Sequence, residues 1–149
     1  MNLLMEAKEG YSVSIDIATT PAKAFNALSE NIDKWWGKTD QAALKTGGIF
    51  TVSWGEPWYQ FQLIEIVPEE KLVWECIDAN QIIDDLEGVQ KEWVGTRIVW
   101  TISVISDGMV RIDLVHEGLV PTFICYEVCS RTWGSYVTEH LKHYLEKSA

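Results

Sequence analysis

Apolar and polar residues alternate along most of this chain, and alternation with a period of two is typical of half-buried β-strands. In the segment 11–17, Val13, Ile15 and Ile17 all lie on one side. The same pattern predicts five further strands, at residues 49–54, 58–67, 72–77, 97–105 and 110–116. Short turns such as Asp107-Gly108 separate them, and we therefore expect sequential antiparallel hairpins.

One of these strands changes its alternation midway. Within 58–67, Phe61 and Leu63 share one parity, whereas Ile64 and Ile66 share the other. Such a switch predicts a β-bulge, which bends the strand and the sheet around it.

Helical signals occur near both ends of the chain. Thr20 is expected to cap a helix that begins at Pro21, where the missing N–H of proline costs nothing. A second short helix is expected at 32–36. A long amphipathic helix is expected from about 130 to 147, with one apolar stripe made by Trp133, Val137, Leu141 and Tyr144.

The order of elements predicts an α+β fold of the helix-grip kind, formed by residues 1–149 as a single domain. A curved antiparallel sheet of six to seven strands would grip the long carboxy-terminal helix, with two short helices after the first strand. Between 78 and 95 the periodicity fades, and we expect either an extended hairpin connection or a mobile flap. Any hollow between helix and sheet is expected to be the functional site.

The net charge of the chain limits the kinds of molecule that it is expected to bind. Twelve basic and 22 acidic residues give a net charge of −10. This surface repels phosphate backbones and anionic membranes, which argues against nucleic-acid binding. The chain contains no run of 18 apolar residues and its first residues do not resemble a signal peptide, and we therefore expect no membrane insertion and a cytoplasmic location.

Three cysteines, Cys76, Cys125 and Cys129, are an odd number and indicate reduced, mostly buried thiols. The four-residue spacing of Cys125 and Cys129 brings their sulfurs together only if that segment is helical. His140, His143 and Glu139 resemble a metal site, but the sequence offers no further ligand. We therefore expect no metal and no cofactor.

His116 is the polar residue of most interest, because it shares the parity of the apolar residues Ile112 and Leu114. A buried neutral imidazole needs partners for both nitrogens. Two interpretations stay open: a structural histidine bonded to backbone or hydroxyl groups, and a histidine that orients a ligand or transfers a proton. Glu65 would be a partner if the bulge turned it inward. Neither a nucleophile elbow nor a phosphate-binding glycine loop is present, and no residue is assigned a catalytic role.

Eight tryptophans are a high number for this length, and they serve either as core or as the wall of a cavity. From strand parity and the helical stripe, we expect the ligand-binding wall to consist of Phe50, Trp54, Phe61, Trp74, Trp100, Ile112, His116, Trp133 and Val137.

The chain resembles the START-like, or SRPBCC, superfamily over residues 11–147, and most of all the branch related to the activator of the heat-shock-protein-90 ATPase (AHSA-type). The matching pieces, in order, are Thr20-Pro21 with Ala24-Phe25, Trp35-Trp36, Gly47-Gly48 with Phe50, Val67-Pro68 with Leu72-Val73-Trp74, the segment 114–119, and Trp133-Gly134 with Leu141 and Leu145. Relatives commonly have Gly-Trp where this chain has Trp133-Gly134.

The resemblance implies a hydrophobic cavity between the sheet and the long helix, which relatives use for lipids, polyketides or hormones. We therefore expect non-enzymatic binding of a small apolar or aromatic ligand. Two alternatives stay open: a co-chaperone-like module that acts on heat-shock-protein-90, and a cyclase- or hydratase-type enzyme that uses His116. A homodimer is a further partner to be considered.

Overall fold

The computed structural model describes residues 9–147. The elements in chain order are β1 (Gly10–Ile17), α1 (Pro21–Ala27), the 3₁₀-helix η2 (Ile32–Lys34), β2 (Lys38–Thr39), β3 (Ile49–Ser53), β4 (Trp58–Val67), β5 (Lys71–Asn80), β6 (Arg97–Ser106), β7 (Met109–Glu117), α2 (Tyr126–Ser135), the π-helix η3 (Tyr136–Leu141) and α3 (Lys142–Lys147). All six predicted strands are present. The additional strand β2 has only two residues, too few to show a period.

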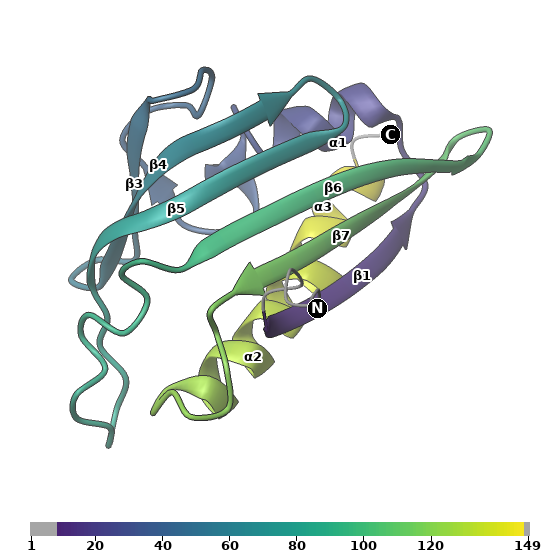
Figure 1. Ribbon diagram of the computed structural model, residues 1–149. Helices are drawn as coiled ribbons and strands as arrows, with labels where there is room; N and C mark the ends of the chain where they lie inside the picture. The colour runs from purple at the N-terminus through teal and green to yellow at the C-terminus, as the bar shows by residue number, and fades with distance from the viewer. Residues whose placement is uncertain (1–8, 148–149) are drawn as a thin grey trace, which may run out of the picture.

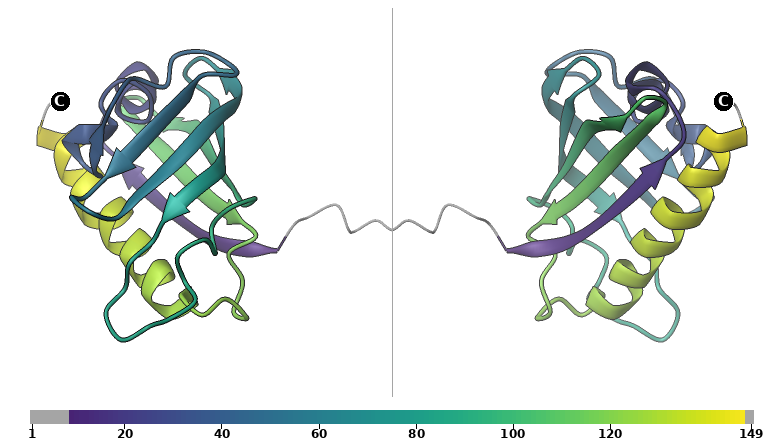
Figure 2. Two further views of the ribbon diagram at one scale, coloured as in Figure 1. Left: turned by 90° about the vertical axis from the view of Figure 1, so that its left-hand side faces the viewer. Right: turned by 90° about the vertical axis from the view of Figure 1, so that its right-hand side faces the viewer.

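The strands form one antiparallel seven-stranded sheet in the order β1-β7-β6-β5-β4-β3-β2. The first strand thus returns to pair with the last, and all other neighbours are sequential. Figures 1 and 2 show the sheet curving around the final helix, which runs along its concave side. The predicted helix-grip α+β fold is confirmed.

Short-range signals explain much of this arrangement. The Thr20 hydroxyl accepts a hydrogen bond from the backbone N–H of Lys23 at 3.2 Å, which caps α1 as expected. Gly108 takes φ +73° in the β6–β7 turn, a conformation that glycine adopts without strain.

Strand β4 contains the predicted bulge. Its register against β5 shifts between Gln60 and Phe61 and again between Leu63 and Glu65. The bulge does not turn Glu65 inward, and that part of the prediction is wrong. The Glu65 side chain is 49% exposed, and its carboxylate lies 3.3 Å from the Lys71 ammonium.

The final helix is continuous from Tyr126 to Lys147, and it begins one turn earlier than the sequence predicts. Its buried stripe is Trp133, Val137, Leu141 and Leu145. The middle section η3 is a π-helix, and such wider turns are frequent at functional sites.

The connection between β5 and β6, residues 81–96, packs against the start of α2. Both oxygens of the Glu92 carboxylate accept backbone N–H groups, those of Ile124 at 2.7 Å and Cys125 at 3.0 Å. The Lys91 ammonium donates to the carbonyl of Ala79 at 2.6 Å. These contacts fit an anchored connection better than an open flap. Figure 1 shows this connection and the start of α2 at the same end of the molecule.

The core between sheet and helix is rich in aromatic rings. Trp74, Trp100, Phe50 and Phe61 are all fully buried, which fills the central part of the space under the helix. None of the helices formed by residues 9–147 has the length and apolar character needed to cross a membrane.

Candidate functional site

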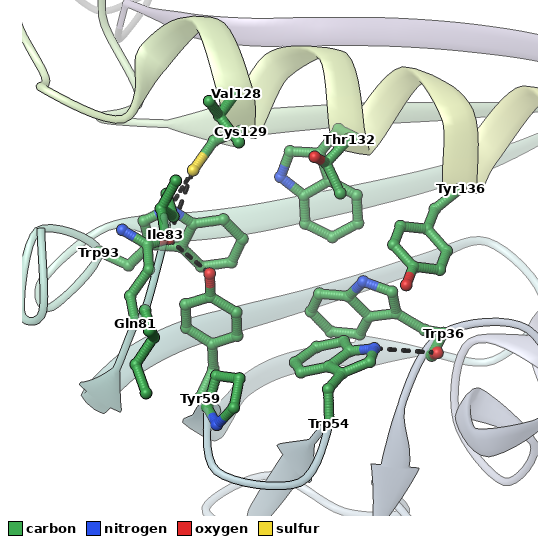
Figure 3. Close-up of a pocket in the computed structure, with 13 residues that line it drawn as sticks. Trp36, Trp54, Tyr59, Gln81, Ile83, Trp93, Val128, Cys129, Thr132 and Tyr136 are labelled. Atoms are coloured by element: carbon green, nitrogen blue, oxygen red, sulfur yellow. Dashed lines mark hydrogen bonds between the residues drawn. The ribbon is translucent and has the colours of Figure 1, made fainter. Parts of the chain in front are cut away.

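A cavity of about 280 Å³ lies between the first half of the final helix, the 81–96 connection and strand β4. Most of its walls are aromatic or aliphatic (Figure 3). The lining residues are Trp36, Trp54, Pro57, Tyr59, Gln81, Ile82, Ile83, Trp93, Val128, Cys129, Thr132, Trp133 and Tyr136. We refer to this space as the aromatic cavity.

Four of its rings lie in nearly parallel planes. Trp93 stacks on Tyr59 with ring centroids 4.0 Å apart and planes 15° apart, and it stacks on Trp133 at 5.8 Å and 14°. Trp36 stacks on Trp133 at 4.9 Å and 23°. Trp54 stands edge-on to Trp36, with planes 75° apart. The walls are thus rigid ring surfaces with one dominant orientation.

Close packing fixes Trp36 and Trp54, the two tryptophans on the sheet side of the cavity. The Trp54 indole N–H donates to the carbonyl of Trp36 at 3.2 Å. Gly37 leaves room for this contact, because a Cβ at that position would lie 2.6 Å from Trp54 Cε2. The short helix η2 and strand β3 are therefore joined directly below the cavity.

Gln81 organises one edge of the aromatic cavity. Its Nε2 donates to the carbonyl of Val89 at 2.9 Å, and its Oε1 accepts the hydroxyl of Tyr59 and the thiol of Cys129, the latter at 3.3 Å. The Trp93 indole N–H donates to Cys129 Sγ at 3.4 Å. Burial raises the pKa of Tyr59 well above its ordinary value, and the phenol is a neutral donor here.

Away from Gln81, three polar groups of the lining, on Trp36, Thr132 and Tyr136, have no hydrogen-bond partner within residues 9–147. Within residues 9–147, neither the Trp36 indole N–H nor the Tyr136 hydroxyl forms a hydrogen bond, although Trp36 is only 9% exposed. In Figure 3 the Tyr136 hydroxyl points from the helix toward the Trp36 indole. These groups are available to a bound molecule.

His116 lies outside the lining of the aromatic cavity, fully buried behind it. Its Nδ1 accepts the indole N–H of Trp133 at 3.0 Å, and its Nε2 lies 2.8 Å from the Thr96 hydroxyl oxygen. The Thr96 hydroxyl donates to the carbonyl of Trp93 at 2.6 Å, and Nε2 must therefore carry the proton that Thr96 accepts.

This network keeps the His116 imidazole neutral. Burial lowers its pKa to about 3. Both nitrogens already have protein partners, which matches the structural interpretation of this histidine. The His116 ring therefore holds Trp133 in the cavity wall and connects it to Thr96, at the end of the 81–96 connection.

The nine residues expected to form the wall divide into two groups. Trp54 and Trp133 line the aromatic cavity. The other seven belong to the buried interior that surrounds it: Phe50, Phe61, Trp74, Trp100, Ile112, His116 and Val137. Strand parity and, for Val137, the helical stripe correctly give the face on which they lie, but side chains of facing elements fill the space between them.

Several residues that line the cavity were not predicted from the sequence. Tyr59 shares the parity of Phe61, and Tyr136 lies one helical turn after Trp133, and these two signals could have identified them. Trp93 lies in the aperiodic connection 81–96, where no pattern marks it as buried.

The thiols and the charged groups offer little further chemistry. Cys76, Cys125 and Cys129 are free and buried, and burial raises the pKa of the Cys76 thiol to about 12. Cys125 and Cys129 are one helical turn apart, because the Cys129 N–H donates to the Cys125 carbonyl at 2.8 Å. In the part of the chain that the structure describes, no three His, Cys, Asp or Glu side chains are placed to hold a metal ion.

Solved structures of similar fold are numerous. The Aha1 dimer from Colwellia psychrerythraea is 19% identical, with a TM-score of 0.74 over 93% of this chain and 96% of that one. Protein MLL2253 from Mesorhizobium loti is 18% identical, with a TM-score of 0.72 over 93% and 98%. DynU16, from the dynemicin biosynthetic locus, is 12% identical with a TM-score of 0.74, and the match covers 95% of this chain but 49% of DynU16.

At these identities the structures show a shared fold alone. No curated protein matches the sequence. A family model, however, matches residues 18–146, which is most of the chain and includes every lining residue of the aromatic cavity. The chain therefore belongs to the family of Activator of Hsp90 ATPase homolog 1-like proteins.

Proposed function

We propose that this protein binds a small, mostly apolar molecule in the aromatic cavity. The observation that carries the proposal is a space of about 280 Å³ that the surrounding side chains leave unfilled, lined mainly by rings and aliphatic groups. Small-molecule sites are typically apolar clefts with a few placed polar groups, and this space lies near the lower end of their usual volume, about 300–1,000 Å³.

The surroundings of the cavity support a binding role over a catalytic one. His116, the best acid–base candidate in the sequence, has both nitrogens bonded to Trp133 and Thr96 and does not line the cavity. The groups that face the space can hold a molecule by contact and hydrogen bonding. Binding of this kind would take place in the cytoplasm, where the three thiols stay reduced.

A panel of lipids and aromatic compounds tests the proposal by thermal shift and calorimetry. We expect at least one compound to raise the melting temperature of the wild type and to bind in a one-to-one ratio. Val128→Phe fills part of the cavity and should weaken that binding at least tenfold. Arg131→Phe is the matched control, because Arg131 lies on the same helix, is exposed and does not line the cavity. No binding across the panel, or equal binding by both variants, would reject the proposal.

The family's description favours a second candidate, a co-chaperone that acts on heat-shock-protein-90, and the similar Colwellia structure is a dimer. An ATPase assay with the cognate chaperone separates the two candidates. If the wild type stimulates the ATPase and Val128→Phe stimulates it equally, the co-chaperone role is favoured. Sedimentation of the free protein would show whether it forms a homodimer.

A further inference from the structure

We infer that the molecule held in the aromatic cavity is a neutral, planar aromatic compound with a hydrogen-bond acceptor on its edge, anchored by Trp36 and Tyr136. This inference rests on the proposed binding function and adds the chemical class of the ligand. Three features of the cavity carry it: the orientation of its rings, its lack of charge and its unpartnered donors.

The rings favour a flat molecule. The ring planes of Trp36 and Tyr59 are 7° apart. The plane of Trp93 is 15° from that of Tyr59 and 14° from that of Trp133. A planar aromatic ligand in the same orientation can stack on the ring faces that these mutual contacts leave open. A saturated, puckered ring system of similar size presents axial hydrogens to the same walls and loses much of that contact.

The lining favours a neutral molecule. Among the described residues that line the cavity, none is Asp, Glu, Lys, Arg or His. A carboxylate or an ammonium group brought into this space would lose water without gaining an opposite charge. The net charge of −10 adds a long-range penalty for anions.

The unpartnered donors favour a ligand that carries an acceptor. Trp36 is more than nine-tenths buried, its indole N–H can only donate, and no acceptor within residues 9–147 receives it. The Tyr136 hydroxyl points to the same edge and is likewise unpaired in the described chain (Figure 3). By contrast, Tyr59, Cys129 and Trp93 are satisfied around Gln81. A carbonyl oxygen on the ligand would pair with the free donors and would orient the molecule toward the helix.

Four probes of similar size test each feature by calorimetry: 2-acetylnaphthalene, 2-ethylnaphthalene, 2-acetyldecalin and 2-naphthoate. We expect 2-acetylnaphthalene to bind most tightly. 2-Ethylnaphthalene, which lacks the acceptor, should bind about three- to tenfold more weakly, as expected for the loss of a neutral hydrogen bond. The puckered decalin ketone and the anionic naphthoate should each bind at least tenfold more weakly.

Tyr136→Phe removes a single hydroxyl and should reduce the affinity for the naphthyl ketone about threefold while leaving 2-ethylnaphthalene unchanged. Tyr144→Phe is the control, because Tyr144 is also half-buried on the final helix but does not line the cavity. Circular dichroism would establish that both variants are folded.

The outcomes separate this inference from the proposed function. Binding of the decalin ketone or of naphthoate as tightly as the naphthyl ketone would overturn the inference while leaving apolar binding intact. Equal affinities of the two naphthalenes, together with no effect of Tyr136→Phe, would overturn the acceptor anchor. Failure of all four probes, in a protein that binds only lipids of the broader panel, would reject the aromatic class and leave apolar binding intact.

Discussion

At the scale of single residues, the main polar feature of the interior is a neutral histidine. One of its ring nitrogens accepts a hydrogen bond and the other donates one. His116 accepts from Trp133 and donates to Thr96, and burial lowers its pKa to about 3. The sequence predicts the inward direction of this ring from its parity with Ile112 and Leu114. It cannot predict the partners, because Thr96 and Trp133 reach the ring only through tertiary packing.

The low pKa of His116 makes stability depend on pH. Between its ordinary pKa of 6.5 and about 3, the unfolded chain binds a proton at this site that the folded chain does not bind. Its contribution to stability is therefore complete above about pH 6.5 and is lost as the pH falls, with a slope of about 1.4 kcal/mol per pH unit.

Urea unfolding of the wild type and His116→Gln at several pH values from about 7.5 to 5 measures this effect. We expect His116→Gln to be less stable at neutral pH, because Trp133 and Thr96 lose a well-placed partner, and its stability to fall less steeply on acidification. The difference in slope between the two proteins is the readout, since the titration of the carboxylates is common to both. His140→Gln, which alters an exposed histidine, should keep the wild-type slope. Parallel pH profiles for all three proteins would contradict the assignment.

At the scale of elements, the connection 81–96 and the final helix act as one wall of the cavity. Glu92 receives the first free N–H groups before α2, where the helix dipole also favours a negative charge. Strand boundaries could be predicted closely because alternation is a local property of each segment. The connection could not, since Val89 and Trp93 are buried by long-range contacts that leave no period in the sequence.

Removing the Glu92 carboxylate should loosen this wall. We expect Glu92→Ala to destabilise the protein by about 0.5–2 kcal/mol, the usual range for loss of a helix cap, and to speed amide exchange at Ile124 and Cys125. Glu87→Ala, in the same connection but exposed, should change neither quantity. Hydrogen exchange read by NMR gives the residue-level result, and unchanged protection at both amides in Glu92→Ala would show that the contact does not hold the wall.

At the scale of the whole molecule, a curved sheet and a helix enclose more space at one end than the side chains fill. The centre is packed by Phe50, Trp74 and Trp100, whereas the end beside the 81–96 connection keeps an open volume of about 280 Å³. Binary pattern and element order predict the fold and the concave face. The position of the cavity depends on which side chains meet across that face, and only the tertiary structure settles this.

Occupation of the aromatic cavity by a small molecule is tested most directly by the eight indole N–H signals in a ¹H–¹⁵N NMR spectrum. On titration with 2-acetylnaphthalene, we expect saturable shifts of the Trp36, Trp54, Trp93 and Trp133 signals, with the largest at Trp36, whose N–H gains an acceptor. The Trp35 signal should stay nearly constant, because its N–H is bonded to the Ala27 carbonyl at 2.7 Å and its ring does not line the cavity. If calorimetry shows that the compound binds, shifts of similar size at all eight indoles, or none at Trp36, would contradict binding in this cavity.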